Sequence, residues 1–175
     1  LLDNDSLEIH ATIPTFMGNI NKIVRISLNE ERVTLRYAFS NWKRPIGSMR
    51  LGIMTLLPDF FNHSFSLSCA NGGKRKESFN FDSKMSINHV KASSTIVSST
   101  TGLGATEGNI QISDKQNNVQ LSWDPTECAV MPMIQHEKGL SRIYFSMLET
   151  DETSKESSSM GSFELHISGS KKQKM

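Results

Sequence analysis

The residues best suited to chemistry by type and spacing form one polar loop, Asn41-Trp42-Lys43-Arg44. An exposed indole stacks well on a sugar ring, and neighbouring amide and cationic groups can bond the ring's hydroxyl groups. The pattern therefore marks Asn41, Trp42, Lys43 and Arg44 as candidate ligand-binding residues. The alternative is structural: close to Pro45 and Ile46 in the sequence, the indole of Trp42 would cap one end of the sandwich. We favour this alternative for Trp42 itself.

The histidines and cysteines follow no metal-binding or catalytic motif. The five histidines have no partner at the HxH, HxxxH or HExxH spacing typical of zinc sites. His10 and His166 alternate with apolar neighbours, so we expect both on the sheet face opposite the core. Cys69 and Cys128 lie far apart in apolar runs, which predicts buried free thiols, with a disulfide as the alternative. We predict neither a metal ion nor a cofactor.

Patterns for phosphate binding and catalysis also fail in their context. The glycines between Gly102 and Gly108 precede a strand pattern, whereas a phosphate site needs a helix N-terminus, so we expect an inter-strand loop. There is no GxSxG motif around a nucleophilic serine. Carboxylate pairs for glycoside hydrolysis come from separate strands, so spacing does not reveal them. We expect Glu127, Glu137 and Glu149 to be surface carboxylates and the chain to be no enzyme on its own.

Charge and hydrophobicity restrict the partners. The 175 residues include 19 Lys and Arg and 18 Asp and Glu, a formal net charge of +1. The basic end, Lys171-Lys172-Gln173-Lys174, is too short for a nucleic-acid-binding arm. No stretch approaches the roughly 20 apolar residues of a membrane span. We therefore expect no nucleic acid and no membrane, but a protein or an uncharged sugar. The chain begins at Leu1 without Met, which favours a piece of a longer polypeptide; the compartment stays open.

Alternation of apolar and polar residues dominates the chain and predicts strands. Ten to twelve short strands without a helical pattern are typical of an all-β, antiparallel sandwich. We expect a single domain over residues 1–170 and a basic tail over residues 171–175. The clearest runs are 7–13, 20–28, 32–39, 49–57, 65–69, 108–113, 119–123, 128–134, 141–149 and 163–167.

Three of these runs carry more specific expectations. The continuous apolar run 49–57 predicts an inner strand covered on both faces. Pro132 interrupts the run 128–134 and predicts an edge position or a bulge, because proline cannot donate to a ladder. Trp123 is in phase with Leu121, which predicts that its side chain belongs to the core.

Several segments resemble a known domain type. The hairpin Asn21–Leu28 and Arg32–Tyr37, the strand Arg50–Leu57, the hairpin Gly108–Asp114 and Val119–Trp123, and the segment Ala129–Gln135 carry this resemblance. They are similar to the galactose-mutarotase-like β-sandwich of α-amylase-type glycoside hydrolases, in particular the C-terminal domain of glycoside hydrolase family 57. In that family the hydrolytic carboxylates belong to a separate domain. The resemblance therefore implies an accessory domain, and the His and Glu pattern of a sugar mutarotase is not recognisable in this chain.

Three hypotheses follow from these observations. The first is a non-catalytic accessory β-sandwich domain of a carbohydrate-active enzyme, which packs on the catalytic domain of the same polypeptide and contacts polysaccharide. The second is a protein-interaction or adhesion module of immunoglobulin-like type, which an extended apolar patch would favour. The third is a small sugar epimerase or hydrolase, which requires His and Glu side chains to converge in one cleft.

Overall fold

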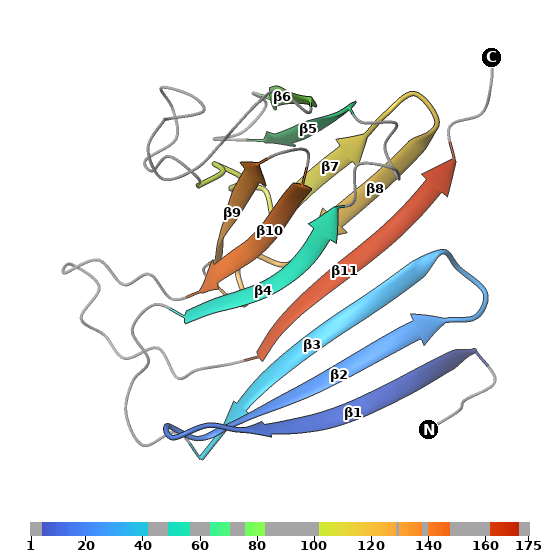
Figure 1. Cartoon of the computed structure of the whole chain (residues 1–175). Coiled ribbons are helices and arrows are strands. Elements are labelled where there is room, and N and C mark those ends of the chain that lie inside the picture. The colour runs from blue at the N-terminus through green and yellow to red at the C-terminus, as the bar shows by residue number, and fades with distance from the viewer. Residues whose placement is uncertain are drawn as a thin grey trace.

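A computed structural model describes residues 5–41, 49–56, 64–70, 76–82, 102–128, 130–137, 140–147 and 162–171. Within these ranges the protein is all-β and forms two antiparallel sheets (Figure 1). The eleven strands are β1 (Ser6–Pro14), β2 (Asn19–Ser27), β3 (Arg32–Ser40), β4 (Met49–Leu56), β5 (Ser64–Ala70), β6 (Lys76–Asp82), β7 (Asn109–Ser113), β8 (Asn117–Ser122), β9 (Val130–Glu137), β10 (Leu140–Met147) and β11 (Ser162–Lys171). The predicted antiparallel β-sandwich of about ten to twelve strands is confirmed. None of the described residues belongs to a helix long and apolar enough to cross a membrane.

The two sheets differ in size. The large sheet has eight strands in the order β1-β2-β3-β11-β8-β7-β5-β6, and the small sheet has three, β4-β10-β9. In Figure 1 the small sheet lies over the part of the large sheet beyond β3, while β1, β2 and β3 extend to one side. Ring contacts agree with this arrangement. The ring centroid of Phe145 of β10 lies 5.5 Å from that of Trp123 and 5.6 Å from that of Phe163 of β11. The small sheet therefore covers only part of the large one.

Local turns build the two clearest hairpins. β2 and β3 pair from Asn19↔Ser40 to Ile26↔Val33, which confirms the hairpin expected from the runs 20–28 and 32–39. β7 and β8 are joined by a turn in which the carboxylate of Asp114 accepts hydrogen bonds from the amides of Gln116 and Asn117, at 2.7 and 2.5 Å. This Asx-type turn fixes the register of the second hairpin.

The core lies between the inner face of the large sheet and the small sheet. Alternation puts every second side chain of each strand into this layer. The largest fully buried side chains are Phe81, Phe145, Phe163, Leu67, Ile110, Ile112, Leu121, Ile134, Ile143, Met147 and His136. They come from both sheets, so the core joins the two layers.

The structure confirms some specific expectations and corrects one. Trp123 is buried and β9, which contains Pro132, is an edge strand of the small sheet. Cys69 and Cys128 are buried and are not joined by a disulfide. The expectation of an inner strand at 49–57 is wrong, because β4 is the other edge strand of the small sheet and Thr55 is exposed.

The predicted glycine-rich loop is a packed segment. Leu103 is buried and its amide donates to the carbonyl of Pro132 at 2.8 Å. Gly102 bridges Met133 of β9. The segment thus lies along the free side of β9 and covers part of that edge.

Candidate functional site

The predicted ligand-binding loop begins at the end of β3. Asn41 is exposed and has a φ of 59°, a left-handed conformation that departs from the extended backbone of β3. The β1–β2 turn approaches this point closely, since a Cβ at Gly18 would lie 2.9 Å from the carbonyl oxygen of Ser40. Trp42, Lys43 and Arg44 lie outside the described residues. The sugar-stacking role of this loop therefore stays a prediction.

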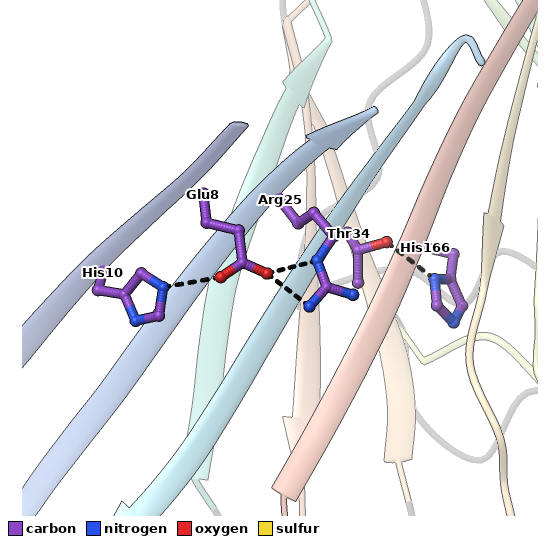
Figure 2. Close-up of polar contacts among 5 residues, drawn as sticks. All are labelled: Glu8, His10, Arg25, Thr34 and His166. Carbon is purple, nitrogen blue, oxygen red and sulfur yellow. Dashed lines mark hydrogen bonds and ion pairs between the residues drawn. The ribbon is translucent and has the colours of Figure 1, made fainter. Parts of the chain in front are cut away.

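A row of polar side chains crosses the outer face of the large sheet. Figure 2 shows Glu8 between His10 and Arg25, with Thr34 and His166 continuing the row. One residue from each of five adjacent strands forms the row. In the strand order β1, β2, β3, β11 and β8, these cross-strand partners are Glu8, Arg25, Thr34, His166 and Ser122. Both expected outward histidines are confirmed on this face. The strand register brings these polar residues together. The next residue on each strand is apolar and points to the opposite face of the sheet.

Glu8 is the electrostatic centre of this row. It accepts hydrogen bonds from His10 Nε2 at 2.9 Å and from Arg25 Nε at 2.5 Å. These two bonds to His10 and Arg25 favour the ionised carboxylate and lower the pKa of Glu8. The group is solvent-accessible, so the pairing orders the β1–β2 edge more than it stabilises the fold.

The second histidine has a similar local arrangement. His166 Nδ1 lies 3.1 Å from the hydroxyl of Thr34, and its Nε2 lies 3.4 Å from Glu164 Oε1. The described residues thus include two His–Glu pairs, but β1 and β11 are separated by β2 and β3. Three strand spacings place the pairs roughly 14 Å apart on one sheet face. They do not converge in one cleft, as the epimerase hypothesis requires.

A third histidine, His136 of β9, is buried between the sheets. Its Nε2 lies 2.7 Å from the backbone carbonyl of Asp82, and because a carbonyl only accepts, Nε2 carries the hydrogen. Its Nδ1 then accepts from the hydroxyl of Ser141, at 2.5 Å. The ring packs edge-on against Phe65 and Phe81. A Ser–His pair this buried has no access to substrate; it links β9 and β10 of the small sheet to β6 of the large sheet.

The predicted carboxylates and a missed one behave differently. Glu127 and Glu137 are exposed, as expected, and Glu149 lies outside the described residues. Glu137 contributes to a cavity of about 320 Å³ together with Arg142. Glu77 is the carboxylate that the sequence did not single out: it is 9% exposed, and neither carboxylate oxygen has a hydrogen-bond partner among the described residues. The sequence signal for its burial was spacing, because Glu77, Phe79 and Phe81 are every second residue of one strand and so share a face.

An apolar surface extends the core beyond the small sheet. The partners Ile9, Val24, Leu35 and Leu165 form one row across β1, β2, β3 and β11. Leu165 is buried in the core, whereas Ile9 at the other end is 53% exposed. Ile13 of β1 is 44% exposed in the same phase. We call this surface, formed by Leu7, Ile9, Ile13, Ile20, Val24 and Ile26, the apolar wing.

Comparisons with known proteins give a fold similarity. No known protein-family model matches the sequence. No curated protein is similar to it in sequence. The solved structure of α-N-acetylgalactosaminidase NagBb from Bifidobacterium bifidum with GalNAc is similar at a TM-score of 0.56 and 8% identity, over 94% of this chain and 28% of the enzyme chain. Its ligand-free form matches at a TM-score of 0.52 and 9% identity, over 93% and 27%. The likeness is one of fold, and the chain spans little more than a quarter of that enzyme.

Proposed function

We propose that the chain is a non-catalytic accessory β-sandwich domain of a carbohydrate-active enzyme of the glycoside hydrolase type. Its apolar wing packs on the catalytic domain of the same polypeptide. The observation that carries the proposal is the row of apolar side chains from Leu165 to Ile9. Leu165 is buried in the core and Ile9 is exposed to solvent, and every residue of the row is apolar. Contiguous exposed apolar surface of this kind is typical of a protein interface.

The wing has the composition of an interface core. It is free of charged side chains except Lys22, whose ammonium lies 5.5 Å from the centroid of the Tyr37 ring at the border with the closed core. Phe16, in the β1–β2 turn, is a further apolar side chain and is 93% exposed. Charged groups of β1 and β2, such as Glu8 and Arg25, lie on the opposite face. Interfaces share this depletion of charge at their centre.

The fold comparison supports a partner for the apolar wing within the same polypeptide. The sandwich matches little more than a quarter of a glycosidase chain, so that in the neighbour a chain segment of this fold is combined with a larger remainder. A catalytic domain packed on the apolar wing would bury the part of the large sheet that the small sheet leaves exposed. Contact with polysaccharide at Asn41, Trp42, Lys43 and Arg44 is the second element of the proposal. Asn41, the described residue of this loop, is exposed and so accessible to a ligand, which supports it.

Thiol labelling in the complete polypeptide encoded by the gene tests the docking. Ile9→Cys places a thiol on the apolar wing, and Thr12→Cys places one on the outer face of the same strand, where it is the matched control. We expect the thiol at position 9 to react in the isolated chain and to be protected at least about tenfold in the complete polypeptide. The thiol at position 12 should react equally in both. The buried native Cys69, whose pKa burial raises to about 11, stays a slow background.

Equal labelling at position 9 in the two contexts would contradict docking, and so would a gene that encodes no catalytic domain. The second candidate is a protein-interaction module of immunoglobulin-like type, which the same exposed apolar surface favours. It predicts labelling at position 9 in the complete polypeptide and protection only when a separate protein is added. The two candidates therefore differ in which molecule provides the protection.

A further inference from the structure

A cavity of about 810 Å³ lies at the end of the large sheet opposite the apolar wing. It is bordered by the start of β5, the end of β6 and the turn between β7 and β8. Its polar residues on the strands alternate with core residues and so belong to the outer face of the sheet, while the core residues Phe65 and Phe81 also border the cavity. The side chains used below are Ser66, Asn80, Asp82, Ser113, Lys115 and Gln116.

A pair of hydroxyl groups lines the cavity. Ser66 Oγ lies 3.2 Å from Ser113 Oγ and 3.2 Å from the Ser113 carbonyl oxygen, and both residues are half-buried. Ser66 and Ser113 are cross-strand partners, and Asn80 is the partner of Ser66 on the other side. Three hydrogen-bonding side chains thus stand side by side on adjacent strands, positioned by the sheet ladder.

Two further contacts fix the walls. The Asp114 carboxylate accepts from two amides of the β7–β8 turn, and this turn presents Lys115 and Gln116. On β6, the backbone carbonyl of Asp82 is held by buried His136, while the Asp82 side chain is exposed at the rim. A site held in place before its ligand arrives loses less conformational entropy on binding.

The lining matches the chemistry of a sugar. Each sugar hydroxyl both donates and accepts, and the cavity offers carboxylate acceptors, amide and ammonium donors and hydroxyls that do both. Its described charges are two carboxylates, Asp82 and Asp114, against the ammonium of Lys115, a balance that disfavours anionic ligands. The volume is within the range of small-molecule sites. We propose that this cavity binds a neutral sugar unit of an oligosaccharide. The inference rests on the proposed association with carbohydrate, but not on docking by the apolar wing.

NMR titration of the ¹⁵N-labelled chain with galactose, glucose, N-acetylgalactosamine and neutral oligosaccharides of these sugars tests the proposal. We expect the largest amide shifts at Ser66, Asn80 and Lys115. The double variant Asn80→Ala, Asp82→Asn should weaken binding by about tenfold or more, because the amide of Asn80 is lost and the charged acceptor at position 82 becomes a neutral amide. Gln111→Ala, on the same outer face but outside the cavity, is the matched control and should bind as the original chain does.

The variant Trp42→Ala separates this cavity from the predicted loop site. Binding that survives Trp42→Ala and is lost in the double variant supports the cavity. Binding lost in Trp42→Ala and retained in the double variant assigns the sugar to the loop and overturns the inference. Absence of shifts with every sugar at millimolar concentration also overturns it. Thiol protection at position 9 is measured separately, so docking can hold when sugar binding fails, and a thermal unfolding midpoint confirms that each variant is folded.

Discussion

Cys69 and Glu77 face each other as cross-strand partners on the inner side of β5 and β6. Burial, with a smaller contribution from the Glu77 charge, raises the pKa of Cys69 from 9.0 to about 11. In the unfolded chain the thiol therefore loses its proton first as the pH rises. The free energy of unfolding should keep this contribution below pH 9 and lose it between about pH 9 and 11, by on the order of 1–2 kcal/mol.

Urea denaturation of the original chain and of Cys69→Ala at pH 8 to 11 measures this effect. Lysines and tyrosines titrate in the same range, so the quantity of interest is the difference between the two chains at each pH. We expect the alanine variant to be less stable at pH 8 and the gap to narrow toward pH 11. Two parallel curves would contradict the prediction. Burial raises the pKa of Cys128 as well, which leaves a residual slope in the variant.

His136 should be a structural residue, since both of its ring nitrogens are bonded inside the core. His136→Ala removes the ring from Phe65 and Phe81 and leaves the Asp82 carbonyl and the Ser141 hydroxyl without these bonds. We expect a loss of about 3 kcal/mol in the free energy of unfolding. Ser141→Ala, which removes one hydrogen bond, should cost about 1 kcal/mol. Equal stability of His136→Ala and the original chain by urea denaturation would be incompatible with the proposed link between the sheets.

At the scale of elements, the glycine before β7 controls how the second hairpin meets the core. Gly108 has a φ of 66°, and a Cβ there would lie 2.3 Å from the Trp123 carbonyl oxygen. Gly108→Ala should therefore destabilise the chain by about 2 kcal/mol or more. A Cβ at Gly169 of β11 would meet no atom within 4 Å, so Gly169→Ala should be neutral or stabilising by about 0.5 kcal/mol. Thermal unfolding of the two variants in parallel checks both signs.

Alternation predicted the strands themselves because a half-buried strand needs every second residue to be apolar. It placed His10, His166 and Trp123 on the correct faces for the same reason. It failed for β4, since a continuous apolar run is compatible with an inner strand and with an edge strand of a small sheet. It also could not pair His136 with Asp82, because their contact depends on how β9 lies over β6, far away in sequence. The same holds for the cavity, whose walls come from three separate strands and a turn.

For the whole molecule, the decisive feature is unequal cover of the large sheet. The small sheet packs on β11 and β6 through Phe145 and His136, whereas β1 has an edge without a described strand partner and an exposed apolar face. Stability within a protein follows such differences, since regions with few buried contacts open locally. The polar row on the outer face holds β1 by the Glu8 contacts, which are solvent-accessible and contribute little.

Native-state hydrogen exchange of the isolated chain should resolve this gradient. Amides of β8, next to the fully buried Leu121, should open only by global unfolding, and amides of β1 should open locally at a free energy lower by about 2 kcal/mol or more. β6 is the control, because it is the opposite edge of the same sheet but buries Phe81 in the core. In the complete polypeptide, docking should slow β1 and leave β6 unchanged. If β1 exchanges as slowly as β8 in the isolated chain, its edge is already covered, and the apolar wing has no need of a catalytic domain to close it.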